Sequence, residues 1–157
     1  MPTSRKTGDS LLLEILEEGY VRKAWHGPNL HQSLRGVSAE EAAWRPAPAR
    51  HNIWEIVVHA AYWKYVVRRR LCGGKRGSFT LKGSNWFVRP EELSEKAWRA
   101  DLALLESEHG KLRQAFVDDL AGKARRTPAR LLFGVALHDV YHAGQIRLLR
   151  RLQMGIS

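Results

Sequence analysis

Apolar residues recur at helical spacing in four stretches of the chain, and no stretch shows the sustained alternation of apolar and polar residues that is typical of a β-strand. The first stretch begins after Asp9 or Ser10, either of which can cap a helix, and runs to about Trp25. The HGP sequence at residues 26–28 predicts its end, because glycine leaves a helix easily and proline disfavours helix in the residue before it. The pattern therefore indicates an all-helical chain.

Capping residues delimit the other three helices. Asn52 and Glu55 have the spacing of a capping box and open a helix that runs to about Cys72, where two glycines follow. Ser94 caps the third helix. The fourth covers about residues 127–153 and carries a proline in its first turn, where proline is well tolerated.

The connection between the first and second helices, residues 29–51, contains prolines that prevent a long helix. Short helical turns are predicted within it at LHQSL (30–34) and SAEEAAW (38–44). In the second of these, Ser38 and Glu41 have capping-box spacing. We therefore expect two helical turns inside an otherwise irregular segment.

The connection between the second and third helices, residues 73–93, is polar and contains glycines. Four helices with apolar faces favour an all-α fold, a four-helix bundle with long connections after helices 1 and 2. The length suits a single domain over residues 1–157, and we expect residues 1–10 to form a flexible tail.

The chain is strongly basic, with 26 Lys and Arg against 16 Asp and Glu and a net charge of +10. Residues 64–89 carry eight cations and no acid, and residues 122–157 carry seven bases and one acid. This charge favours an anionic small molecule as a partner. Nucleic acid is not expected, because no helix-turn-helix, zinc-finger or RNA-binding signature accompanies the charge.

The single cysteine, Cys72, excludes a disulfide framework and a thiolate-rich metal site. No apolar run approaches membrane-spanning length, and residues 1–10 lack the apolar stretch of a secretory signal. We therefore expect a cytoplasmic protein without membrane contact. Cys72 is predicted to be a small packed thiol. The tryptophans predicted to pack in the core and between helices are Trp25, Trp44, Trp54, Trp63 and Trp98.

Two histidines interrupt the apolar line of the fourth helix. His138 and His142 lie four residues apart, and Gln145 follows on the same line, which is expected to face the interior. Imidazoles at this spacing can converge on one ion. The full line is Leu131, Val135, His138, His142, Gln145, Leu149 and Leu152.

The second and third helices place two further imidazoles on inward positions, His59 and His109. Because a buried polar group without a partner costs about 1–3 kcal/mol, these rings need compensation. Either they are separate hydrogen-bonded core histidines, or several share one cation. Three imidazoles around one ion leave coordination positions open, as a catalytic metal requires.

Two segments resemble the DinB superfamily, a group of metal-binding four-helix bundles that includes YfiT-like proteins. They are HNIWEIVVHAAYWKYVVRRRL (51–71) and LHDVYHAGQIRLLRRL (137–152), and AWHGPNL (24–30) is similar to the end of the first helix in one branch of that family. The most specific feature is the single histidine of the second helix together with His-xxx-His-Ala-Gly-Gln in the fourth.

The resemblance implies that His59, His138 and His142 bind a divalent metal, which in this family is nickel, zinc, iron or manganese. It also implies a homodimer and a metal-dependent enzyme, a thiol S-transferase or a hydrolase, that acts on a small molecule with a low-molecular-weight thiol. Because the sequence is short, we expect no additional C-terminal domain of the kind that the mycothiol-dependent isomerase carries, and therefore do not expect that particular reaction. The alternative is a non-catalytic, metal-stabilised bundle that acts through dimerisation or protein association.

Other polar residues near these positions have competing interpretations. Gln145 either bonds a metal-bound group or ligand histidine, or pairs with a neighbouring helix. Glu55 either leans toward the ion or caps its helix, and capping is favoured. His109 is either a fourth ligand or a core imidazole that donates to a carbonyl, and the core imidazole is favoured. His26 and His51 lie at helix ends, where they cap backbone or line the rim of the site.

Overall fold

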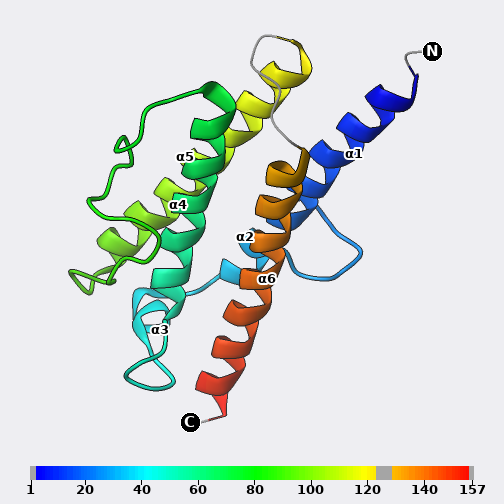
Figure 1. Ribbon diagram of the computed structural model, residues 1–157. Helices are drawn as coiled ribbons and strands as arrows, with labels where there is room; N and C mark the ends of the chain where they lie inside the picture. Colours follow the sequence, from blue (N-terminus) through cyan, green and yellow to red (C-terminus); the bar gives the residue numbers. More distant parts are fainter. Residues whose placement is uncertain (1–2, 123–128, 156–157) are drawn as a thin grey trace.

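The chain folds into helices joined by irregular connections, as the computed structural model in Figure 1 shows. The structure describes residues 3–122 and 129–155, and the side chains from residue 8 onward within those ranges. In these ranges there is no β-strand, so the prediction of an all-helical protein is confirmed. The helices are α1 (Thr3–Tyr20), α2 (Leu30–Leu34), α3 (Ala39–Ala43), α4 (Ile53–Cys72), α5 (Glu95–Leu120) and α6 (Ala129–Met154).

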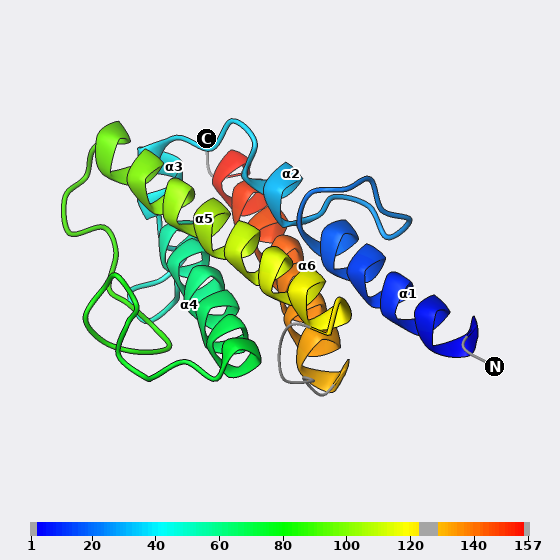
Figure 2. The same ribbon diagram turned by 90° about the horizontal axis from the view of Figure 1, so that it is seen from above.

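The four long helices lie side by side, with α4 packed against both α5 and α6, and α1 packed against α6 (Figures 1 and 2). The short helices α2 and α3 lie near the C-terminal part of α6, where the Arg150 guanidinium donates to the carbonyl of Ser33 at 3.1 Å. The long connection between α4 and α5 folds back along α4. The chain between α1 and α4 thereby closes one end of the helix assembly.

The N-terminal helix differs from the prediction at both ends. It begins at Thr3, so most of the expected tail belongs to the helix, and it ends at Tyr20, before Trp25. The buried side chain of Asn29 donates to the carbonyl of Arg22 at 2.8 Å and holds the chain in a turn. This turn places Trp25 in the connection, where it is fully exposed, so the prediction that Trp25 packs between helices is wrong.

The capping predictions are confirmed for α3 and α5, and α2 has a capping box formed by Asn29 and Gln32 that was not predicted. Ser38 and Glu41 form a complete capping box, and Ser94 accepts a hydrogen bond from the amide of Ala97. Asn52 caps α4, but Glu55 turns its carboxylate away to Arg45, so the expected second half of that box is absent. The predicted start of the last helix at residues 127–128 lies outside the described residues.

The buried face of α6 is rotated relative to the predicted line. Leu152 is 43% exposed, and His138 and Gln145 are half-buried. The sequence favoured the wrong face because a carboxylate was not expected inside. Asp139 is fully buried, and an ion pair with Lys64 of α4 compensates its charge. The buried positions of α6 are Leu132, Val135, Ala136, Asp139, His142, Ala143, Ile146 and Leu149.

A buried charged cluster joins the four long helices: Glu17 of α1, Lys64 of α4, His109 of α5 and Asp139 of α6. The Lys64 ammonium contacts Asp139 and donates to Nδ1 of His109 at 3.3 Å. Nε2 of His109 lies 3.5 Å from the Glu17 carboxylate. The prediction that His109 donates to a carbonyl is therefore wrong, because its Nδ1 accepts from the buried Lys64 and its Nε2 faces the Glu17 carboxylate.

The stability of the fold is expected to depend on pH through His109. Burial and the neighbouring Lys64 lower the pKa of His109 from 6.5 to about 2, so the folded protein keeps this ring neutral. Below pH 6.5 the unfolded chain gains a proton that the folded protein does not, and the free energy of unfolding falls. Between pH 7 and pH 5, the free energy of unfolding should therefore fall by about 2 kcal/mol less in His109→Gln than in the unmodified protein.

Urea unfolding of both proteins at the two pH values measures this difference. The remaining titratable groups are common to both, so their contributions largely cancel in the comparison. An identical pH dependence in the two proteins would contradict the assignment of a neutral buried imidazole.

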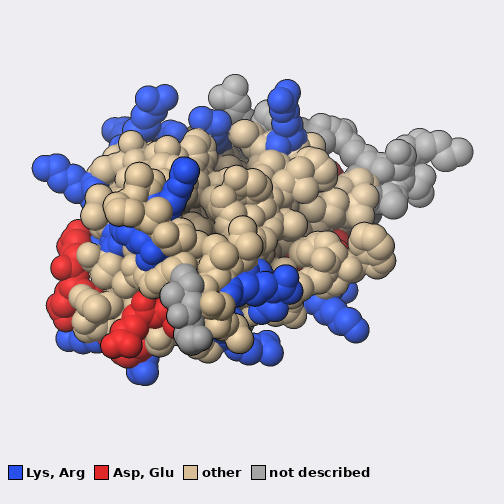
Figure 3. Space-filling view, turned by 90° about the horizontal axis from the view of Figure 1, so that it is seen from below, with Lys and Arg blue, Asp and Glu red and all other residues tan. Residues whose placement is uncertain are grey.

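Two surface features complete the fold. Cys72 is exposed, not packed, because it is the last residue of α4 while the preceding Leu71 occupies the core position. On the face seen in Figure 3, basic side chains surround a largely uncharged centre and acidic ones gather at one end. Among the described helices, none combines the length and apolar content that crossing a bilayer requires.

Candidate metal centre

Three imidazoles from two helices meet beside the core. Nε2 of His138 lies 3.1 Å from Nε2 of His59 and 3.0 Å from Nε2 of His142. All three ligand atoms lie within 4.8 Å of one another. His59 and His142 are buried and His138 is half-buried, so the group sits at the margin of the core with one ring toward the surface.

The ring of His59 is held from both sides by the connection after α4. Asn85 adopts a left-handed conformation with φ 64°, which asparagine tolerates better than most residues, and its backbone carbonyl accepts from Nδ1 of His59 at 2.8 Å. The Asn85 side chain accepts from the Trp63 indole at 3.0 Å. Trp86 stacks on the His59 ring at 3.8 Å, and His51 stacks on the other face of Trp86 at 3.6 Å.

The ring of His142 is held by residues of its own helix. Its Nδ1 donates to Oε1 of Gln145 at 2.7 Å, and the Gln145 amide donates in turn to the Tyr141 hydroxyl at 3.1 Å. Because Gln145 is three residues beyond His142, both side chains lie on the same face of α6. This chain of hydrogen bonds fixes the orientation of the imidazole.

These partners determine where the lone pairs point. A carbonyl oxygen only accepts, so His59 and His142 carry their protons on Nδ1 and turn an Nε2 lone pair toward His138. His138 has no described partner at Nδ1 and can give a proton to only one of those two lone pairs. The donor set therefore suits a shared cation better than three rings that satisfy one another.

The electrostatics also favour neutral rings. Burial, with smaller contributions from the other two rings, lowers the pKa of His138 to about 3. Burial lowers the pKa of His142 to about 4, although the Gln145 hydrogen bond opposes the shift. The pKa of His59 is lowered by the same cause. Neutral imidazole is the form that coordinates a metal.

The remaining candidates do not join the group. Glu55 is buried and binds Arg45 at 2.8 Å and His51 at 2.9 Å. Although burial alone would raise its pKa, these hydrogen bonds hold it below the usual value, so Glu55 is an ionised structural carboxylate. His109 belongs to the buried charged cluster, and His26 is exposed in the turn after α1. Only His51 approaches the site, as a stacking partner of Trp86.

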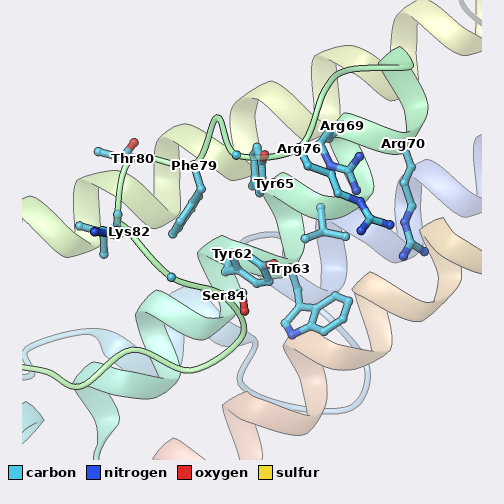
Figure 4. Close-up of a pocket in the computed structure, with 14 residues that line it drawn as sticks. Tyr62, Trp63, Tyr65, Arg69, Arg70, Arg76, Phe79, Thr80, Lys82 and Ser84 are labelled. Atoms are coloured by element: carbon cyan, nitrogen blue, oxygen red, sulfur yellow. The ribbon is translucent and has the colours of Figure 1, made fainter.

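One cavity borders the centre through His138, and a second lies nearby and shares Trp63 with it. The first, of about 440 Å³, lies between α4 and α6 and is lined by His138, Trp63, two arginines and apolar side chains; we call it the α4–α6 groove. The second, of about 710 Å³, lies between α4 and residues 76–84. Figure 4 shows this second cavity, with Arg69, Arg70 and Arg76 gathered at one end of it.

Sequence reasoning missed the residues that support the histidines from the connection. Asn85 and Trp86 lie in a segment without periodicity, and the only available signal was an asparagine in a glycine-containing turn. It also missed the pairing of Lys64 with Asp139. The available signal for this pair was one charged residue within each of two otherwise apolar helix faces. The two residues cannot be matched from the sequence, because it does not show which helices are neighbours.

Comparison with protein families matches residues 23–146, well over half of the chain, to the DinB superfamily. The matched region contains all three clustered histidines and Gln145. No curated protein and no solved structure matches the chain.

Proposed function

The chain belongs to the DinB superfamily, and we propose that it binds one divalent metal ion through Nε2 of His59, His138 and His142. The convergence of these three nitrogens carries the proposal. Nε2 of His138 lies 3.1 and 3.0 Å from the other two Nε2 atoms, so these residues would hold one ion at metal–nitrogen distances of about 2.0–2.1 Å. Three imidazoles suit nickel, zinc, iron or manganese.

We further propose a metal-dependent enzyme of the thiol S-transferase or hydrolase type within the bundle of four long helices. A divalent ion with free coordination positions lowers the pKa of a bound thiol or water and so supplies a nucleophile near neutral pH. The chain's own residues orient this site. Asn85 and Gln145 fix two imidazole rings, while Trp63 and Trp86 shield them from water.

The test is direct measurement of metal content and affinity. The untagged protein, purified without chelators, should contain close to one equivalent of a divalent metal by elemental analysis. After metal removal, calorimetric titration with Ni²⁺, Zn²⁺ or Mn²⁺ should show one site per chain. A protein that contains no metal and takes up none on titration would refute both the metal site and the enzyme.

A second candidate function rests on an exposed apolar stripe on α6. Leu137 is 49% exposed, Tyr141 63% and Leu148 57%, and Phe133 continues the stripe one turn earlier at 44%. Contiguous apolar surface of this kind favours association. On this alternative the protein is a non-catalytic, metal-stabilised bundle that acts as a homodimer. Sedimentation of the unmodified protein and of Leu137→Glu tests the proposed dimer interface, because only the variant should then be monomeric.

Gln145 is expected to tune the metal site through His142. Gln145→Leu removes the acceptor of the His142 Nδ1 proton, and loss of such a supporting hydrogen bond typically weakens metal binding about 10–100-fold. Gln145→Glu retains an acceptor at the same position and should bind at least as tightly as the unmodified protein. Calorimetric titration of both variants measures the difference. Equal affinity in Gln145→Leu and Gln145→Glu would show that Gln145 only packs against its surroundings.

A further inference from the structure

The α4–α6 groove runs from the three histidines to a pair of arginines. Trp63 and His138 line one end, with their ring centroids 6.3 Å apart. Arg70 and Arg130 line the other end. Because helices rise about 1.5 Å per residue, the two ends are separated by about 10–12 Å along α4 and α6.

The middle of the groove is apolar. Val66, Val67, Leu131 and Val135 line it. Gly134 also lines it, and a Cβ atom at that position would meet nothing within 4 Å. A volume of about 440 Å³ lies within the range of small-molecule sites. The groove is therefore shaped for an elongated apolar body.

The two arginines at the far end have no partner of opposite charge among the residues that the structure describes. Neither Arg70 nor Arg130 forms an ion pair or hydrogen bond with a described residue. Figure 4 shows the Arg70 side chain reaching toward α6, whereas its neighbour Arg69 is engaged by the carbonyl of Gly74. Guanidinium groups bind carboxylates and phosphates in forked geometry, so this end is complementary to an anion.

We propose that the α4–α6 groove binds an elongated anionic amphiphile, with its carboxylate or phosphate between Arg70 and Arg130 and its apolar chain directed at His138. This rests on the proposed function in one respect, that the end near His138 is the reacting end. The arginine end, the apolar middle and the His138 end of the groove correspond to the anionic group, the apolar chain and the reacting end of the ligand. They select a linear molecule with the anionic group remote from the site of reaction.

Binding is tested with the fluorescent probe 8-anilinonaphthalene-1-sulfonate and its displacement by hexanoate, octanoate and decanoate. Each added methylene group buried in the groove should tighten binding about fourfold. Decanol, which lacks the charge, should compete at least tenfold less well than decanoate. Decyl phosphate is the matched probe for a phosphate headgroup. If either anion binds more tightly than decanol, the proposal is supported, and the tighter of the two anions identifies the preferred headgroup.

Matched variants locate the binding. Gly134→Leu fills the groove and should weaken decanoate binding at least tenfold, whereas Gly110→Leu, at an open helical position on α5, should not. The double variant Arg70→Gln with Arg130→Gln should remove the preference for decanoate over decanol. Arg99→Gln on α5 is its control.

Failure of this proposal can be told apart from failure of the proposed function, because each has its own measurement. Unchanged decanoate binding in Gly134→Leu, or equal binding of decanol and decanoate, overturns the amphiphile site even if the metal titration shows one ion per chain. Decanoate binding that is sensitive to Gly134→Leu in a protein that takes up no metal supports the groove and refutes only the metal site.

Discussion

We expect His138→Ala to abolish tight binding of a divalent metal while leaving the metal-free fold intact. His138 is the central ring, since its Nε2 lies within 3.1 Å of the Nε2 atoms of both His59 and His142. Loss of a supporting hydrogen bond already costs about 10–100-fold in affinity, so loss of a ligand should cost more than 100-fold. Calorimetric titration with Ni²⁺ or Zn²⁺ measures the change.

The melting temperature tests the same substitution independently. A metal at 100 times its dissociation constant stabilises the folded protein by about 2.7 kcal/mol, which raises the melting temperature of a protein of this size by about 5–10 °C. The unmodified protein should show this rise and His138→Ala should not. His26→Ala, at an exposed histidine outside the group, should behave like the unmodified protein.

The metal-free melting temperature distinguishes the two candidate functions. His138 is half-buried at the margin of the core, so the metal-free variant should melt within a few degrees of the metal-free parent, as expected of a catalytic ion. A parent protein that unfolds when its metal is removed would instead favour the metal-stabilised bundle. Equal metal affinity in His138→Ala and the parent would contradict the assignment of the ligands.

Lys64→Met is expected to be among the most destabilising single substitutions in the chain. Lys64 and Asp139 are both fully buried, and burial raises the pKa of Asp139 to about 6 even beside the Lys64 ammonium. Methionine fills a similar volume but leaves the Asp139 carboxylate without its cation. Removing one partner of a buried ion pair costs about 3–5 kcal/mol. Urea unfolding at pH 7 measures the loss.

The double variant Lys64→Met with Asp139→Asn separates lost charge pairing from lost packing. It removes both charges with little change in volume, so it should be more stable than Lys64→Met alone. The single variant Asp139→Asn completes the comparison. If the losses of stability in Lys64→Met and Asp139→Asn simply add in the double variant, the ion pair is not the source of the effect. Metal titration of the same variants shows whether Asp139, next to His138 in sequence, also positions that ligand.

Much of the candidate metal centre could be predicted from the sequence. His138 and His142 lie one turn apart on one helix, and that spacing is a local property of the α-helix. His59 required the additional expectation that the second and fourth helices are neighbours, which its inward position on an apolar face supported. The supporting roles of Asn85 and Trp86 could not be predicted, because an irregular connection has no periodicity from which to infer where its carbonyls point.

The sequence alone determined where most of the helices lie and the cap residues Ser38, Asn52 and Ser94, since hydrophobic periodicity and capping depend on residues a few positions apart. It also determined which residues could form a metal site. Only the tertiary structure decided which face of α6 is buried. The apolar pattern excluded Asp139 from the interior, whereas Lys64 from α4 compensates its charge there. Such a pairing joins residues 75 positions apart, and its energy exists only once the two helices pack.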